Sequence, residues 1–123
     1  MKFHLSRVDG NVVTGTGPGW VRVGGTEYRE GLVLTPAEVR TGWGAAGFEA
    51  LGEADFTSLL TTDPELVLLG TGARIRFPHP GLTRALAAAG VGIEVMDTPA
   101  ACRTYNILAA EGRRVTAALL LDS

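Results

Sequence analysis

The fold class is decided by residues 66–72, LVLLGTG, in which four consecutive apolar positions lead into a Gly-Thr-Gly triplet. A strand with one buried face alternates apolar and polar side chains, whereas an unbroken apolar run is typical of a strand covered on both faces. Asp63-Pro64 ends any helix before this run, because the residue preceding a proline disfavours helical geometry. Residues 66–72 therefore predict a core strand of an α/β sheet with a loop at its carboxyl end.

Helix and strand patterns alternate downstream of this strand. Pro80 at the first helical position and Gly90 just past the last one bound a helix of about ten residues, which leads to a strand at 92–96. Thr98 as N-cap opens a further helix that runs to residue 110. Residues 115–121, VTAALLL, carry apolar side chains at both odd and even positions, which face opposite sides of a strand. We therefore expect this strand in the middle of the sheet. The order predicts an α/β half with right-handed crossovers.

The amino-terminal part of the chain has the pattern of a β-meander. Residues 20–23 and 26–28 flank Gly24-Gly25, which predicts a hairpin with a two-residue primed turn. The tract 15–19, made mostly of glycine and proline, predicts a loop. Further strands are expected at 11–14, 31–34 and 38–43, and a helix is expected at 53–62.

Length and composition limit the class of protein. The chain has 123 residues, of which 46% are apolar, enough for the core of one domain spanning residues 1–123. Its 11 basic and 13 acidic side chains give a formal charge of −2, which argues against phosphate-driven binding of nucleic acid. The single cysteine, Cys102, excludes a disulfide framework and a multi-cysteine zinc site.

Signals for export, membrane spanning, metal binding and cofactor binding are also missing from the sequence. Residues 1–10 lack the apolar core of an export signal, and no apolar run is long enough to cross a membrane. His4 and His79 have no partner at a metal-binding spacing, and neither a dinucleotide fingerprint nor a P-loop occurs. We therefore expect a cytoplasmic protein that does not span a membrane and holds no metal or cofactor.

The first candidate site is the triplet Gly70, Thr71 and Gly72. Ligands of open α/β sheets gather beyond the carboxyl ends of the strands, where backbone N–H groups can hold an anion. A tight turn that needs a positive φ at its glycines is the alternative. Past the triplet, residues 73–77 alternate like a strand, which would place the side chains of Arg74 and Arg76 on the same face. That face could attract an anion or be simply solvated.

The second candidate site crosses from the strand at 92–96 into the next helix. Asp97 and Thr98 lie where the helix dipole favours anions, and Arg103 and Asn106 share a helix face. Cys102 is either a buried, inert thiol or a nucleophile activated by the dipole. For Arg103, an ion pair with Asp97 that fixes the turn is the alternative to capture of a ligand.

Several segments together resemble one known family: residues 68–72, 77–78 and 94–98, and the ordered run 101–108 with Cys102, Arg103 and Asn106. In these segments the chain is similar to the Mth938-like family, catalogued as a domain of unknown function. The resemblance implies an α/β, three-layer Mth938-like fold, with a mixed central β-sheet, flanking helices and an additional N-terminal β-hairpin layer.

The resemblance also shapes the expected function. Mitochondrial relatives in the family are similar to assembly factors of respiratory complex I, which hold partner proteins. We therefore expect a non-enzymatic interaction protein, a monomer or homodimer, whose partners are subunits of a membrane complex. The alternative is a protein or small enzyme that binds an anionic metabolite between the Gly70–Gly72 loop and the Asp97–Asn106 crevice.

Overall fold

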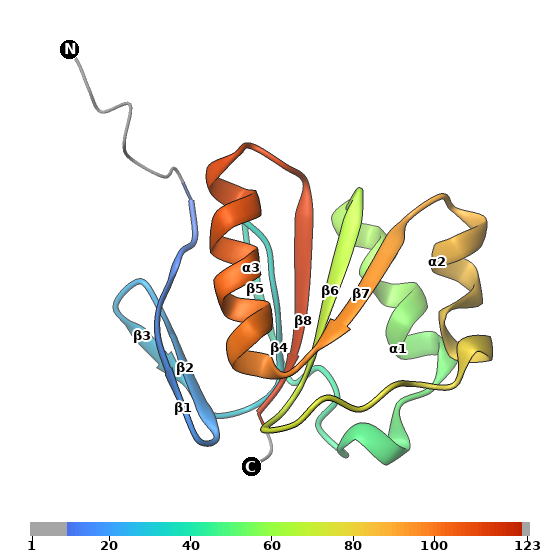
Figure 1. The fold of residues 1–123 in the computed structure, drawn as a ribbon, viewed down its shortest axis with the longest axis horizontal. Helices are drawn as coiled ribbons and strands as arrows, with labels where there is room; N and C mark the ends of the chain where they lie inside the picture. The colour runs from blue at the N-terminus through green and yellow to red at the C-terminus, as the bar shows by residue number, and fades with distance from the viewer. Residues whose placement is uncertain (1–9, 122–123) are drawn as a thin grey trace.

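The computed structural model describes residues 10–121. Residues 1–9 and 122–123 lie outside the described residues, and with them His4 and most of the segment in which an export signal was sought. Figure 1 shows the order of the elements along the chain. The strands are β1 (Val13–Gly17), β2 (Trp20–Val23), β3 (Thr26–Tyr28), β4 (Leu32–Leu34), β5 (Val39–Thr41), β6 (Leu66–Thr71), β7 (Gly92–Met96) and β8 (Val115–Leu120). The α-helices are α1 (Glu53–Thr57), α2 (Arg84–Ala88) and α3 (Thr98–Ala110), and the 3-10 helices include η2 (Phe48–Ala50), η3 (Ser58–Thr62) and η4 (Pro80–Thr83).

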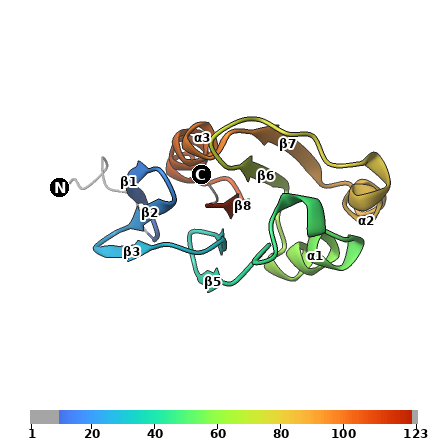
Figure 2. The same ribbon diagram turned by 90° about the horizontal axis from the view of Figure 1, so that it is seen from below.

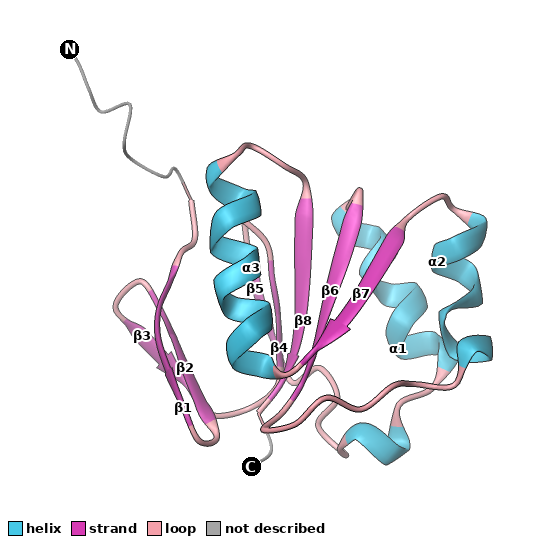
Figure 3. Cartoon of the chain, viewed as in Figure 1, coloured by secondary structure: helices cyan, strands magenta, loops and turns pink. Residues whose placement is uncertain are grey.

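The larger sheet has five strands in the order β5-β4-β8-β6-β7. β6 runs parallel to both β7 and β8, while β4 runs antiparallel to β8 and to β5, so the sheet is mixed. β8 lies in the middle of the sheet, and all six of its residues are buried. This confirms the central position that was predicted from its apolar side chains at both odd and even positions. The strands fan across the centre of the molecule in Figure 3.

The two faces of this sheet bury two separate sets of side chains. Leu68 of β6 packs with α3 and with the strands β1 and β2 on one face, whereas Val67 and Leu69 pack with α1, η3 and α2 on the other. Figure 2 shows α3 and α1 on opposite sides of the sheet. The arrangement is the three-layer fold that the resemblance implied, and it explains the unbroken apolar run in β6.

The smaller sheet, β1-β2-β3, contains the predicted hairpin around Gly24-Gly25. The predicted loop at 15–19 is wrong in part, because β1 continues through Gly17 and pairs it with Trp20. A Cβ atom on Gly17 would collide with the indole ring of Trp20. Glycine is therefore present in this strand to admit an aromatic ring, a role that composition alone does not distinguish from a turn.

Hydrogen bonds fasten the smaller sheet to α3. The side-chain amide of Asn106 donates to Val13 O at 2.8 Å and accepts from Val13 N at 2.9 Å, as a neighbouring strand would. The hydroxyl of Tyr105 donates to Asn11 O at 2.8 Å. These three bonds hold the start of β1 against two consecutive residues of the helix.

Two predicted helices are shorter in their α-helical part than expected. The helix expected at 53–62 is α1 followed by the 3-10 helix η3, and the helix opened by Pro80 begins as η4 before it continues as α2. Within residues 10–121, no helix has the length and apolar character needed to cross a membrane.

Candidate functional site

The three parallel strands end at one edge of the sheet, and this edge brings together most of the predicted site. Gly70 pairs with Met96 of β7 on one side and with Leu119 of β8 on the other. The chain therefore enters α3 through Asp97 and Thr98 beside the Gly70–Gly72 triplet. In an open α/β sheet, the carboxyl edge where connections leave toward opposite faces is the usual position of a ligand or partner.

Thr98 fastens this edge. Its hydroxyl accepts from Gly72 N at 2.8 Å and donates to Leu120 O at 2.7 Å, while its own backbone N–H donates to Gly72 O at 2.9 Å. The side chain is only 6% exposed. One threonine thus joins the ends of β6 and β8 to the first turn of α3, and its hydroxyl is fully engaged within the fold.

The prediction of Thr98 as N-cap is wrong, and the cap is Asp97. The carboxylate of Asp97 accepts from Ala100 N at 2.8 Å. Thr98 is unavailable for capping because its hydroxyl bonds Gly72 and Leu120 instead. The close approach of α3 also requires Gly70, since a Cβ there would lie 3.0 Å from Thr98 Oγ1.

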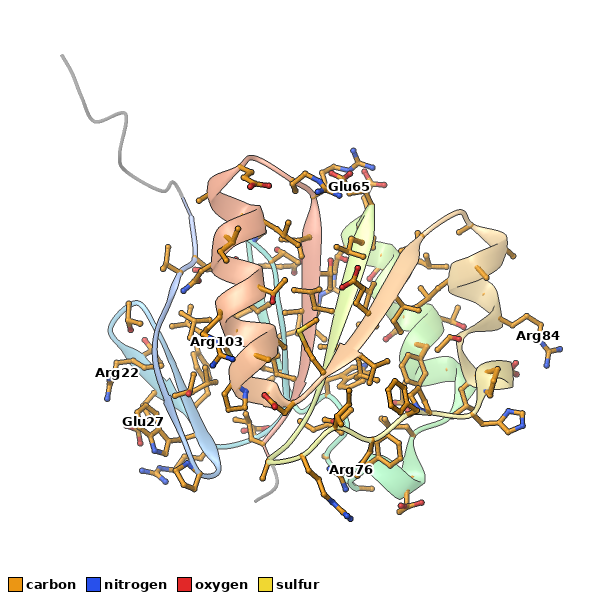
Figure 4. All side chains as sticks on the ribbon, in the orientation of Figure 1. Arg22, Glu27, Glu65, Arg76, Arg84 and Arg103 are labelled. Carbon is orange, nitrogen blue, oxygen red and sulfur yellow. The ribbon has the colours of Figure 1, made fainter. Side chains whose placement is uncertain are left out.

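The segment 73–77 is not the predicted extended strand. The hydroxyl of Thr71 donates to Arg74 O at 2.7 Å and accepts from Arg76 N at 3.0 Å, so the chain turns back on itself. The Arg76 guanidinium donates through Nε to Thr71 O at 3.1 Å and lies 4.8 Å from the ring centroid of Phe48. Figure 4 shows Arg76 beside the end of β6. Thus Arg76 braces the loop, while Arg74 is exposed.

A hollow of about 240 Å3 lies at the carboxyl edge. The hairpin turn at 16–19 forms one wall, and Gly72-Ala73, Thr98-Pro99 and residues 120–121 form the others. The lining is mainly backbone and apolar side chains. Sequence reasoning missed the contribution of residues 16–19, because nothing local shows that a distant hairpin turn closes over this edge.

The remaining predicted residues line a second groove, of about 300 Å3, between β1 and α3. Cys102 is 2% exposed, and burial raises the pKa of its thiol to about 12, which opposes a role as nucleophile. Asn106 is occupied by β1. Arg103 is exposed on the side of α3 toward β1 in Figure 4. Its side chain forms no ion pair with Asp97 and no hydrogen bond to any other residue in 10–121.

Metal-binding residues do not gather in the described part of the chain. Between residues 10 and 121, no three His, Cys, Asp or Glu side chains lie close enough to hold a metal ion together. The side chain of His79 instead accepts from Gly81 N at the start of η4.

Comparison with known sequences places the chain in a family. Residues 13–120 match the family described as proteins of unknown function, DUF498/DUF598. The chain belongs to this family. An uncharacterised protein of Rhodobacter capsulatus is 42% identical over 108 residues, which cover 88% of this chain and 82% of that protein.

A second relative has a description of its function. The bovine NADH dehydrogenase [ubiquinone] 1 alpha subcomplex assembly factor 3 is 38% identical over 80 residues, 63% of this chain. The match covers 44% of the bovine protein, so the chain spans less than half the length of this curated relative.

Solved structures of family members have the same fold. A Bordetella parapertussis protein superposes with a TM-score of 0.86 at 38% identity, covering 94% of this chain and 99% of that one. A Bordetella pertussis protein described as a Mth938-like domain gives a TM-score of 0.71 at 33% identity, covering 100% and 94%. The Mth938-like fold of this chain is thereby confirmed.

Proposed function

We propose that this protein is a cytoplasmic, non-enzymatic binding protein that assists the assembly of a respiratory or other membrane complex. The similarity of the chain to the bovine NADH dehydrogenase [ubiquinone] 1 alpha subcomplex assembly factor 3 supports this role. The observation that carries the proposal is the exposure of two large apolar side chains on one loop at the carboxyl edge. Ile75 is 48% exposed and Phe77 is 72% exposed.

These two side chains have the character of interface anchors. Aromatic residues and arginine are enriched in protein interfaces, and Arg74 is exposed directly beside Ile75. The hydrogen bonds around Thr71 fix the loop before any partner arrives, so little conformational freedom is lost on binding. A fixed apolar projection is suited to insertion into a pocket of another protein.

The site residues predicted from the sequence, which include neither Ile75 nor Phe77, divide into two roles under this proposal. Arg74 and Arg103 contact the partner, since both are exposed and neither side chain forms a hydrogen bond or ion pair within residues 10–121. The rest hold the surface in shape through the contacts described above: Gly70, Thr71, Gly72, Asp97, Thr98, Cys102 and Asn106.

The hollow at the carboxyl edge favours a second candidate, a protein that binds a small metabolite there. Thermal melting against a panel of metabolites tests it directly. A ligand present at a hundred times its dissociation constant should add about 2.7 kcal/mol of stability. A panel without any shift would remove this candidate.

The proposed assembly role is tested by purifying the tagged protein from its own cells in mild detergent and identifying co-purifying proteins by mass spectrometry. We expect near-stoichiometric recovery of membrane-complex subunits, which Phe77→Ser and Arg103→Ala reduce. Glu111→Ala is the control, because Glu111 is exposed but lies at the end of α3 that is far from the carboxyl edge. Normal amounts of assembled membrane complexes in cells lacking the gene would contradict the role.

A further inference from the structure

β7 is an edge strand of the larger sheet, and its outer side carries main-chain groups without a partner. Within residues 10–121 no strand lies beyond it, as the sheet order and Figure 3 show. Gly92 N donates to Glu65 O on the β6 side at 3.4 Å, and successive residues of a strand direct their N–H and C=O groups to opposite sides. The main-chain groups of Ile93 and Val95 therefore point outward, and within 10–121 none of them is hydrogen-bonded.

The other sheet edges in the described part of the chain are shorter or partly occupied. β3 and β5 have three residues each, and both carry a charged side chain, Glu27 and Arg40. At the start of β1, Asn106 takes the N–H and C=O of Val13. β7 has five residues, pairs with β6 without a bulge and contains no proline. Sheets usually protect such an edge, so an open one is suited to receive a further strand.

Glu94 gives the middle of β7 a negative charge. It lies in register with Leu68, which packs with α3, so its side chain is on the α3 side of the sheet. The residue is exposed and forms no ion pair within 10–121. No other residue of β6 or β7 is charged.

The charges at the two ends of β7 offset one another. At the amino end, Glu65 pairs with Arg113 at 3.2 Å. At the carboxyl end, Asp97 follows the strand directly, and Arg74 is brought beside it because the carbonyls of Arg74 and Met96 accept from the same threonine hydroxyl. Neither end therefore carries an excess of positive charge that would repel a cation from the middle of the strand.

The other arginines around this part of the sheet are directed elsewhere. Arg103 is on the side of α3 toward β1, and Arg84 points away from β7 in Figure 4. Arg76 is held at the end of β6, where it donates to Thr71 O. The carboxylate of Glu94 thus remains open to a cation that arrives along the edge.

We infer that the outer edge of β7 binds an extended segment of the partner protein as a further strand of the sheet, with a lysine or arginine opposite Glu94. The inference rests on the proposed function and names the chemistry of its partner. Main-chain groups of the segment pair with those of Ile93 and Val95, and the cation forms a cross-strand pair with Glu94. Residues 73–79 pass the carboxyl end of β7 in Figures 1 and 2, so the added strand extends the surface to which the exposed apolar side chains of that loop belong.

A second copy of this chain fits the edge less well. Val91 N and Asp97 O, on either side of the free groups, are engaged within the fold. A two-fold pairing of β7 with itself therefore uses all the free groups only when Ile93 lies opposite Val95 of the other copy. That register places the two Glu94 side chains directly opposite each other, and like charges so placed are destabilising. A strand with a basic residue makes the same main-chain bonds without this repulsion.

The test uses two synthetic peptides, acetyl-Thr-Val-Lys-Val-Thr-amide and the same peptide with glutamate in place of lysine. Each is titrated into the isotope-labelled full chain, and the backbone amide signals are followed by NMR. We expect the lysine peptide to shift the signals of Ile93 and Val95 and to bind at least about fivefold more tightly than the glutamate peptide. Methylation of both valine nitrogens, which removes the donors toward β7, should abolish binding.

Reversal of one charge on the protein provides the matched variants. Glu94→Lys should reverse the order of the two peptides, because the glutamate peptide then has the opposite charge to β7. Glu111→Lys makes the same change of charge at the far end of α3 and should alter either affinity by less than about twofold. Melting temperatures of both variants confirm that they are folded.

Other outcomes overturn the inference. No binding, equal binding of the two peptides, or shifts confined to β1 or β5 contradicts it. Shifts of Ile93 and Val95 that grow with protein concentration in the absence of peptide assign the edge to a second copy instead.

The proposed function can fail separately. Undiminished recovery of membrane-complex subunits with tagged Glu94→Lys contradicts the inference and leaves the proposed function intact. Absence of those subunits with the natural sequence contradicts the proposed function, and the peptide titration still decides whether β7 accepts a strand.

Discussion

Gly70 sets how closely α3 approaches the sheet. We predict that Gly70→Ala destabilises the protein by about 1–3 kcal/mol, because the added methyl group would lie 3.0 Å from both Leu119 Cδ2 and Thr98 Oγ1. Urea denaturation measures the effect. The matched control is Gly25→Ala, where a Cβ meets nothing within 4 Å. Equal stability of the two variants would show that α3 can move away from the added methyl group without lowering the free energy of unfolding.

Cys102 provides a second prediction for a single side chain. Its thiol is 2% exposed and has a pKa of about 12, so very little thiolate is present near neutrality. We expect an aromatic disulfide reagent at pH 8 to modify the native protein at least about a hundredfold more slowly than the urea-unfolded chain. Comparable rates would mean that the groove between β1 and α3 opens readily and that the thiol is reactive.

Single residues also show where local sequence patterns lose information. Thr98 matched an N-cap in every local respect, but Gly72 and Leu120, 26 and 22 residues away, use its hydroxyl. The exposure of Phe77 was equally hidden, since an aromatic residue in a short alternating segment is usually part of a core. Both outcomes depend on contacts between distant parts of the chain.

At the scale of elements, Asn106 joins the smaller sheet to α3. We predict that Asn106→Ala costs about 1–3 kcal/mol, because it leaves the backbone N–H and C=O of Val13 without their partners. Hydrogen exchange should accelerate in β1 more than in β6. Arg103→Ala, on the same helix, should leave exchange in β1 unchanged. Uniform acceleration across both sheets would contradict a local fastening role.

Elements with strong periodicity or paired end signals were predicted well. β6, β7, β8 and the hairpin β2-β3 occur where apolar runs and turn residues indicated. The failures at 15–17 and 73–77 share a cause. Glycine in β1 admits the ring of Trp20, and the hydroxyl of Thr71 bends an alternating segment into a loop. In each case a tertiary or side-chain contact overrides local propensity.

At the scale of the whole molecule, stability should fall in alkaline solution. Burial raises the pKa of the Cys102 thiol from 9.0 to about 12 and also raises the pKa of Tyr105. Above pH 9 the unfolded chain releases these protons before the folded one does, so the unfolded state is favoured as pH rises. Each proton that the unfolded chain releases and the folded chain retains lowers the free energy of unfolding by about 1.4 kcal/mol per pH unit.

Urea denaturation between pH 8 and pH 10.5 measures this dependence. At pH 8 we expect Cys102→Ala to be less stable than the natural sequence. Because the variant has no thiol to ionise, its stability should fall less as the pH rises, and the difference in free energy of unfolding between the two proteins should become smaller. Parallel curves would indicate that the thiol ionises equally in the folded and unfolded chains.

The position of β8 has a consequence for how the protein is made. β4 and β6 are both synthesised before β8, yet each is hydrogen-bonded to β8 and not to the other. While a ribosome is still translating residues 72–114, the nascent chain therefore presents two sheet edges with a gap between them. Such edges attract chaperones and neighbouring nascent chains. Insertion of residues 115–120 closes the gap and completes the surface on which a partner could bind.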